Sequence, residues 1–135
     1  MTSALLIIGS VFLGLAALIH LYIFFLESVV WSRPSTWKVF GLKSQEEAET
    51  VKPMAYNQGF YNVFLAVGVG IGLILLSTAN LAQAGFALTI FAGGSMVLAS
   101  VVLITSSPRL ARSAAIQGVA PLIGIILLVA GLATN

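Results

Sequence analysis

The sequence predicts an all-α membrane protein, a bundle of four transmembrane helices in a single domain. Of its 135 residues, 59% are hydrophobic and only 7% are charged, whereas charged residues make up about 25% of an ordinary soluble domain. Four apolar stretches each supply the roughly 20 residues that cross a hydrocarbon core of about 30 Å. They cover residues 4–31, 54–76, 81–105 and 113–133. The lipid bilayer is therefore the first partner that the sequence predicts.

The first apolar stretch is longer than a membrane crossing requires. At 1.5 Å per residue, a helix over residues 4–30 extends about 40 Å, so we expect it to tilt or to protrude. Trp31 ends the stretch, and tryptophan is enriched at membrane interfaces; if Trp31 marks the interface, Glu27 lies about one turn inside the membrane. If the helix instead protrudes, Glu27 lies among the headgroups, while His20 is inside the core in either case. The residues before the stretch lack the basic segment and the cleavage site of a signal peptide, so we expect this helix to be retained.

Residues 32–53 form the only sizeable polar stretch, an amphipathic loop on the cytoplasmic side. Pro34 ends the first helix, and Ser44 to Glu47 form a capping box that opens a short surface helix ending before Pro53. We expect the apolar side chains of the loop to lie against the lipid headgroups. These are Trp37, Val39, Phe40 and Leu42.

The basic residues predict the orientation of the chain. All six fall in the connections 32–53 and 106–112, while the connection near residues 77–80 carries no charge. Basic residues concentrate in cytoplasmic loops, so both termini are expected outside and the protein is expected in the plasma (inner) membrane.

Several classes of function are excluded by composition. The chain has no cysteine and one histidine, so it contains no disulfide framework and no zinc motif. We expect no metal and no cofactor. The six basic residues form no dense patch, so the sequence predicts no nucleic-acid partner.

A stripe on the first helix is the leading candidate for a functional site. His20 and Glu27 are seven residues apart, which is about two helical turns, so they share one face with Phe24 and Trp31. An ionisable group at membrane depth costs about 2.5 to 3.5 kcal/mol on insertion scales and usually faces the bundle interior. The stripe combines a proton-exchanging imidazole with a carboxylate.

Amides and a phenol occur at a similar depth on the other helices. Counting from the cytoplasmic boundary at 1.5 Å per residue places Glu27 and the first amides about 5 to 7 Å inside the membrane, and His20 about 16 Å inside. We therefore predict one polar pocket that opens toward the cytoplasm and has His20 as its floor. Its residues are His20, Glu27, Asn57, Gln58, Tyr61, Asn62 and Gln117. Hydrogen bonding that merely holds helices together is the alternative for the amides.

Two glycine patterns bear on helix packing. Gly68 and Gly72 form a GxxxG pair, which is typical of close helix contacts within one chain or in a homo-oligomer. Gln58-Gly59 and Gln117-Gly118 occupy matching places at the starts of the second and fourth helices. These pairs indicate two duplicated helical hairpins, with coincidence as the alternative.

The motifs also resemble a known family of small bacterial membrane proteins. The resemblance is carried by the run from His20 to Glu27 and Trp31, by residues 40–42, by residues 57–62, and by Gln117-Gly118 with Pro121. The family is catalogued as a domain of unknown function. The resemblance implies four transmembrane helices in one domain, and it implies no particular activity or ligand.

The residues leave three classes of function open. The leading hypothesis is a pocket that binds a small polar or amphipathic ligand, or that couples proton movement to small-molecule transport, with Glu27 titrating and His20 as a deeper relay. The first alternative is a membrane-embedded enzyme that performs acid-base chemistry on a lipophilic substrate. The second is a structural or accessory membrane subunit.

Overall fold

The computed structural model describes residues 4–134, and these are helical apart from short connections. The elements in chain order are α1 (Ala4–Phe24), the π-helical turn η1 (Phe25–Val29), α2 (Pro34–Trp37), α3 (Gln45–Leu76), the 3-10 turn η2 (Ala79–Leu81), α4 (Ala82–Ser106), the 3-10 turn η3 (Pro108–Leu110) and α5 (Ala111–Ala133). The described residues contain no strand.

Four helical segments are long and apolar enough to cross a membrane. They are Ala4–Val29, Gln45–Leu76, Ala79–Ser106 and Pro108–Ala133. The predicted fold class, an all-α bundle of four membrane-spanning helices, is confirmed. The chain is thus a multi-pass membrane protein.

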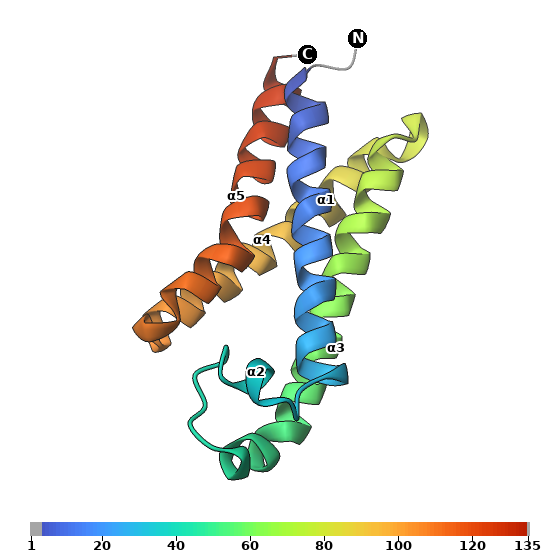
Figure 1. Ribbon diagram of the computed structural model, residues 1–135. Helices are drawn as coiled ribbons and strands as arrows, with labels where there is room; N and C mark the ends of the chain where they lie inside the picture. The colour runs from blue at the N-terminus through green and yellow to red at the C-terminus, as the bar shows by residue number, and fades with distance from the viewer. Residues whose placement is uncertain (1–3, 135) are drawn as a thin grey trace.

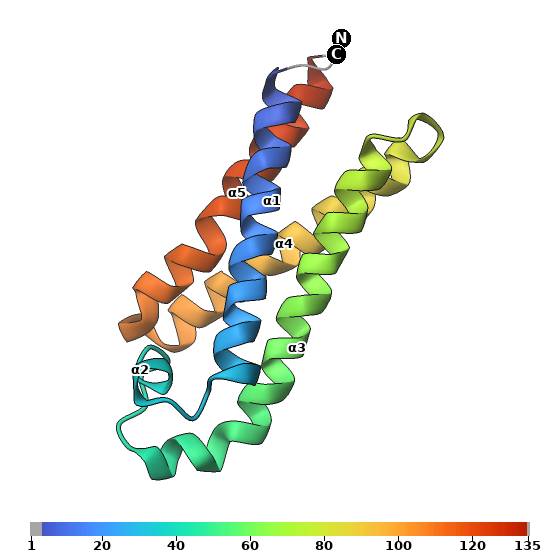
Figure 2. The same cartoon turned by 45° about the vertical axis from the view of Figure 1, so that its right-hand side comes forward.

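The four long helices form a ring in which each packs against two neighbours: α1 contacts α3 and α5, and α4 contacts the same two. The start of α1, the end of α5 and the α3–α4 connection lie at one end of the bundle, and α2 and the α4–α5 connection lie at the other (Figures 1 and 2). We call this second end, formed by residues 30–53 and 107–112, the basic end, because it holds all six basic residues. The buried centre is apolar and consists of Leu13, Ala16, Val69, Ala92, Met96, Ala120 and Leu128.

Glycines allow two helix pairs to approach backbone to backbone. A Cβ placed on Gly9 of α1 would lie 2.8 Å from the amide nitrogen of Leu128 on α5. Similarly, a Cβ on Gly85 of α4 would lie 2.7 Å from the carbonyl oxygen of Gly72 on α3. Small residues permit this close contact. Helices in lipid associate largely through such packing, because their burial against one another gains no hydrophobic free energy relative to lipid.

The GxxxG pair of α3 faces α4 within the same chain. Gly72 abuts Thr89 and Gly85, and a Cβ on Gly68 would lie 3.1 Å from the Cβ of Ala92. This face therefore serves internal packing. The homo-oligomer through Gly68 and Gly72 stays a prediction, and it would require a second copy to reach glycines that α4 already contacts.

The predicted boundary at residue 54 is wrong, because the surface helix and the second transmembrane helix are one continuous helix, α3. Ser44 caps this helix as predicted, because its Oγ accepts from the Glu47 amide at 3.1 Å. The reciprocal bond of a capping box is displaced by one residue: Glu47 Oε2 accepts from the Lys43 amide, at 2.8 Å, instead of the Ser44 amide. Pro53 lies inside α3. Proline removes one backbone hydrogen bond and bends a helix, and Figure 2 shows the first turns of α3 at a steep angle to the rest. The carbonyl that loses its helical partner belongs to Glu49, an exposed residue.

The first helix also ends differently from the prediction. It is α-helical to Phe24 and continues as η1 to Val29, and the side chain of Trp31 beyond it is buried. The Trp31 indole donates to the Ala48 carbonyl at 2.8 Å. A second apolar cluster forms here from Trp31, Trp37, Ala48 and Ala55, with Phe40, Leu42 and Val51 packed against it. Of the loop residues expected at the headgroups, Val39 is the one that is largely exposed.

Gly9→Ala tests the close approach of α1 and α5. The added methyl group meets backbone atoms of Leu128 that cannot rotate away, so we expect the free energy of unfolding to fall by about 1 to 3 kcal/mol. Gly14→Ala is the matched control, because a Cβ there meets nothing within 4 Å. Alanine is the better helix former, so this variant should be up to about 1 kcal/mol more stable. Unfolding followed by circular dichroism in one detergent measures both, and equal effects would contradict the packing described.

Candidate functional site

Glu27 is a buried carboxylate at the contact between α1 and α3. Glu27 is 7% exposed and Asn62 is 6% exposed. The Oε2 atom of Glu27 accepts a hydrogen bond of 2.9 Å from Nδ2 of Asn62. Asn62 Nδ2 also donates to the Gln58 carbonyl, at 3.1 Å. The amide thus ties the carboxylate to the backbone of the neighbouring helix.

The local backbone explains why this contact is so close. Glu27 is the middle residue of η1, and the Val30 amide donates to the Phe25 carbonyl at 3.1 Å across five residues, as in a π-helix. A Cβ on Gly59 would lie 3.3 Å from the Glu27 Cβ and 3.2 Å from the Ser28 Cβ. Because Gly59 lacks that atom, two consecutive residues of η1 rest against α3. Single π-helical turns occur frequently at functional sites.

The carboxylate of Glu27 has no cationic partner in the part of the chain described. The ion pair found within residues 4–134 joins Lys52 to Glu49 on the surface, at 3.4 Å. Glu46, Glu47 and Glu49 are exposed at the basic end. Glu27 is therefore the one buried carboxylate side chain of these residues, and it forms no ion pair.

His20 lies deeper in the bundle and is 1% exposed. Its Nδ1 donates to the Ala16 carbonyl at 2.9 Å, one turn earlier in α1. A neutral imidazole with its proton on Nδ1 keeps Nε2 as an acceptor. Since seven residues of helix rise about 10 Å, His20 and Glu27 share a face without a hydrogen bond between them.

The structure separates the remaining predicted site residues from the Glu27–Asn62 pair. Asn57, Gln58 and Tyr61 have exposed side chains on α3, and the ring of Tyr61 packs against Phe64 with centroids 6.3 Å apart. Gln117 is half-buried on α5, a helix that packs against α1 and α4. Within residues 4–134 its side chain forms no hydrogen bond. Of the seven residues, only Glu27 and Asn62 are joined side chain to side chain.

Sequence reasoning placed Phe24 on the face of Glu27 but missed two contacts, the hydrogen bond of Ser28 and the packing of Phe24 on Phe60. The Ser28 hydroxyl donates to the Tyr56 carbonyl at 2.9 Å. The ring of Phe60 packs on Phe24 at 5.2 Å and on Tyr56 at 5.1 Å between centroids. Phe24 is three residues before Glu27, and Phe60 follows Gly59, so the helical spacing and the glycine could have indicated both contacts.

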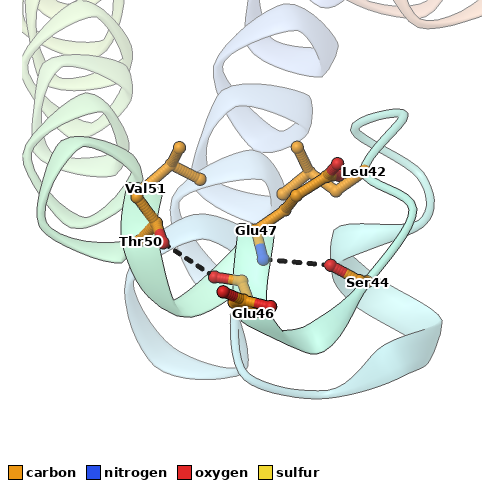
Figure 3. A pocket seen from close by; sticks show the side chains of 6 residues that line it. All are labelled: Leu42, Ser44, Glu46, Glu47, Thr50 and Val51. Atoms are coloured by element: carbon orange, nitrogen blue, oxygen red, sulfur yellow. Dashed lines mark hydrogen bonds between the residues drawn. The ribbon is translucent and has the colours of Figure 1, made fainter.

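A separate surface hollow lies at the start of α3. Its volume is about 380 Å³, and it is lined by Leu42, Ser44, Glu46, Glu47, Thr50 and Val51 (Figure 3). Ser44 caps the helix, and the Thr50 hydroxyl donates to the Glu46 carbonyl at 2.8 Å. These polar groups serve the fold of α3, and the hollow contains none of the predicted site residues. The described residues also contain no group of three side chains that could hold a metal ion.

Asn62→Leu tests whether the amide supports the buried carboxyl group. Removing the donor leaves Glu27 without its partner, so we expect a loss of about 1 to 3 kcal/mol in the free energy of unfolding. Asn57→Leu is the matched control, since that side chain is exposed one turn away, and its effect should stay within about 0.5 kcal/mol. Thermal unfolding in detergent compares the two variants. If Asn62→Leu unfolds at the same temperature as Asn57→Leu, the hydrogen bond does not stabilise the bundle.

Comparison with known proteins agrees with the resemblance predicted from the motifs. No curated protein and no solved structure matches the chain. A family model described as "Protein of unknown function (DUF1304)" matches residues 14–129, a range that includes His20, Glu27, Asn62 and Gln117. The prediction of a family catalogued as a domain of unknown function is confirmed. The chain therefore belongs to the DUF1304 family.

Proposed function

We propose that this membrane protein binds a small ligand at a centre around Glu27 and couples a proton on that carboxyl group to movement of the ligand. The observation that supports the proposal is the burial of Glu27 with a neutral amide as its sole hydrogen-bond partner among the described residues. An ionised carboxylate in such surroundings costs several kcal/mol. Binding of a proton or of a cationic ligand removes that cost, so we expect the site to exchange a proton for the ligand.

The other polar residues have supporting roles in this proposal. Asn62 holds one carboxyl oxygen of Glu27 and leaves the second free for a ligand. His20, about two turns deeper, relays protons toward the far side of the bundle. Asn57, Gln58 and Tyr61 are exposed on α3, and their side chains are not hydrogen-bonded to those of the pair. In this proposal they orient a ligand as it enters, and Gln117 has the same role on α5.

Infrared spectroscopy of the protein in lipid bilayers tests whether Glu27 exchanges its proton. We expect a carboxylic-acid C=O band that changes with pH in the wild type and is absent in Glu27→Gln, which keeps the shape of the side chain. Glu46→Gln, which changes an exposed carboxylate of α3, should leave the band in place. Asn62→Leu should shift its frequency, because the hydrogen bond to the carboxyl group is lost.

The proposal fails if no pH-dependent band disappears in Glu27→Gln. The remaining titratable groups on the elements packed against η1 are His20 and Tyr22 on α1, and Tyr56, Tyr61, Glu46, Glu47, Glu49 and Lys52 on α3. None of them is hydrogen-bonded to Glu27. A band that survives Glu27→Gln and disappears in Glu46→Gln would assign the titration to the surface of α3.

We also propose the orientation in which the basic end faces the cytoplasm and the opposite end, with both termini, faces outward. The positive-inside rule supports it, because all six basic residues gather at one end.

Single cysteines test the orientation, since the native chain has none. A membrane-impermeant maleimide added to intact cells should label Asn80→Cys in the α3–α4 connection. It should label Lys38→Cys in the opposite connection only after the membrane is opened. Both side chains are exposed, so a difference in labelling reports the side of the membrane and not burial inside the protein. The reverse pattern would place the basic end outside.

A further inference from the structure

We infer that the ligand of this site is a hydrophobic molecule with a protonated amine, whose ammonium group binds Glu27 and Asn62 while its apolar body lies against Phe24 and Phe60. This inference rests on the proposed function and adds the chemical class of the ligand. It follows from the hydrogen-bonding capacity, the charge and the apolar surroundings of the pair.

The pair presents acceptors and no free donor. Asn62 uses its Nδ2 group for both of its hydrogen bonds, to Glu27 Oε2 and to the Gln58 carbonyl. The Ser28 hydroxyl hydrogen is engaged with the Tyr56 carbonyl. Within residues 4–134, Glu27 Oε1 and Asn62 Oδ1 have no hydrogen-bond donor. An ionised carboxylate accepts only, so the complementary ligand group is a cation that donates N–H bonds.

The donor set favours an organic cation over a metal ion. A hard cation such as Ca²⁺ takes about six to eight oxygen ligands. The pair offers two free side-chain oxygens, and no group of three metal-binding side chains exists among the described residues. An ammonium group needs only two or three acceptors, because it carries at most three N–H donors.

Aromatic rings lie within three residues of the pair on both helices. Phe24 and Phe60 are half-buried and pack edge to face at 5.2 Å between centroids. Tyr56 continues this group on the outer side of α3, where it is 53% exposed. Aromatic faces attract a cation and also contact its hydrocarbon portion. A ligand can therefore approach from the lipid along the seam between α1 and α3, past these rings.

Proton exchange follows from charge balance at the site. When Glu27 is protonated, binding of an ammonium ion releases one proton, and the carboxylate then pairs with the ligand. Removal of the ligand restores the cost of a buried negative charge, which favours renewed protonation. The ammonium ion and the proton thus compete for one carboxylate.

Calorimetric titration of the full chain in detergent with phenethylammonium chloride tests this inference. We expect saturable binding to the wild type and to Glu46→Gln, and at least about tenfold weaker binding to Glu27→Gln, because a charge-assisted hydrogen bond is lost. Phe60→Leu should weaken binding about threefold. Titration in two buffers of different ionisation enthalpy should show proton release on binding. The proton release should be absent in Glu27→Gln.

Two analogues separate the contributions of charge and of N–H donation. Phenethyl alcohol keeps the body without the charge and should show no saturable binding. The trimethylated ammonium keeps the charge without N–H donors and should bind more weakly than phenethylammonium. Equal binding of the alcohol and the ammonium, unchanged binding to Glu27→Gln, or no binding at all would overturn the inference. If the infrared band of Glu27 still titrates in that case, the proposed function stands and only the ligand class is wrong.

Discussion

The hydrogen bond from Asn62 provides a donor to the carboxyl group of Glu27, which is buried between two apolar helices. Hydrocarbon offers no donor to a carboxyl group, so the donor must come from the protein. Asn62 supplies it from the adjacent helix, and Asn62 is itself held by the Gln58 carbonyl. The relative rotation of α1 and α3 near the basic end is consistent with this requirement, because turning either helix would separate the two side chains.

Glycine positions make that rotation possible. Gly59 lets Glu27 and Ser28 rest against α3, while Gly9 and Gly85 bring the α1–α5 and α3–α4 pairs into backbone contact at other places in the ring. Polar and small residues therefore act together. The glycine sets the distance between two helices, and the polar side chains beside it then come within hydrogen-bonding reach.

Sequence reasoning predicted the fold because hydropathy and length are properties of each segment alone. It was less successful wherever the outcome depends on contacts between segments. The start of α3 after Ser44 was predicted correctly, but its continuation through Pro53 was not. Ala48 and Val51 before the proline and Ala55 after it pack in one cluster with Trp31 and Trp37. No short sequence motif predicts that contact, because it joins residues that are far apart in the chain.

In the predicted site, too, the depth of each residue depends on one helix alone, whereas contacts between residues depend on two helices. Counting residues gives the depth of a side chain along its helix, and it placed Asn57, Gln58 and Gln117 at the depth of Glu27, with Asn62 deeper. Depth does not determine the direction in which each side chain points around the helix axis. Asn62 shares the buried face of α3 with Gly59, three residues earlier, whereas Asn57 and Gln58 point outward. The spacing from the glycine, and not depth, identifies the amide that meets Glu27.

The second half of the chain contains a related contact without ionisable residues. Gly118 of α5 packs against Ser100 of α4, as Gly59 of α3 packs against Ser28 of η1. This likeness agrees with the predicted duplication of hairpins without testing it. The residue before the serine is Ala99 instead of glutamate, and the residue three after the glycine is Pro121 instead of asparagine. A serine–glycine helix contact thus forms in this chain with apolar neighbours, so helix packing alone does not require the carboxylate and the amide. Their presence in one half favours a role in binding or proton exchange.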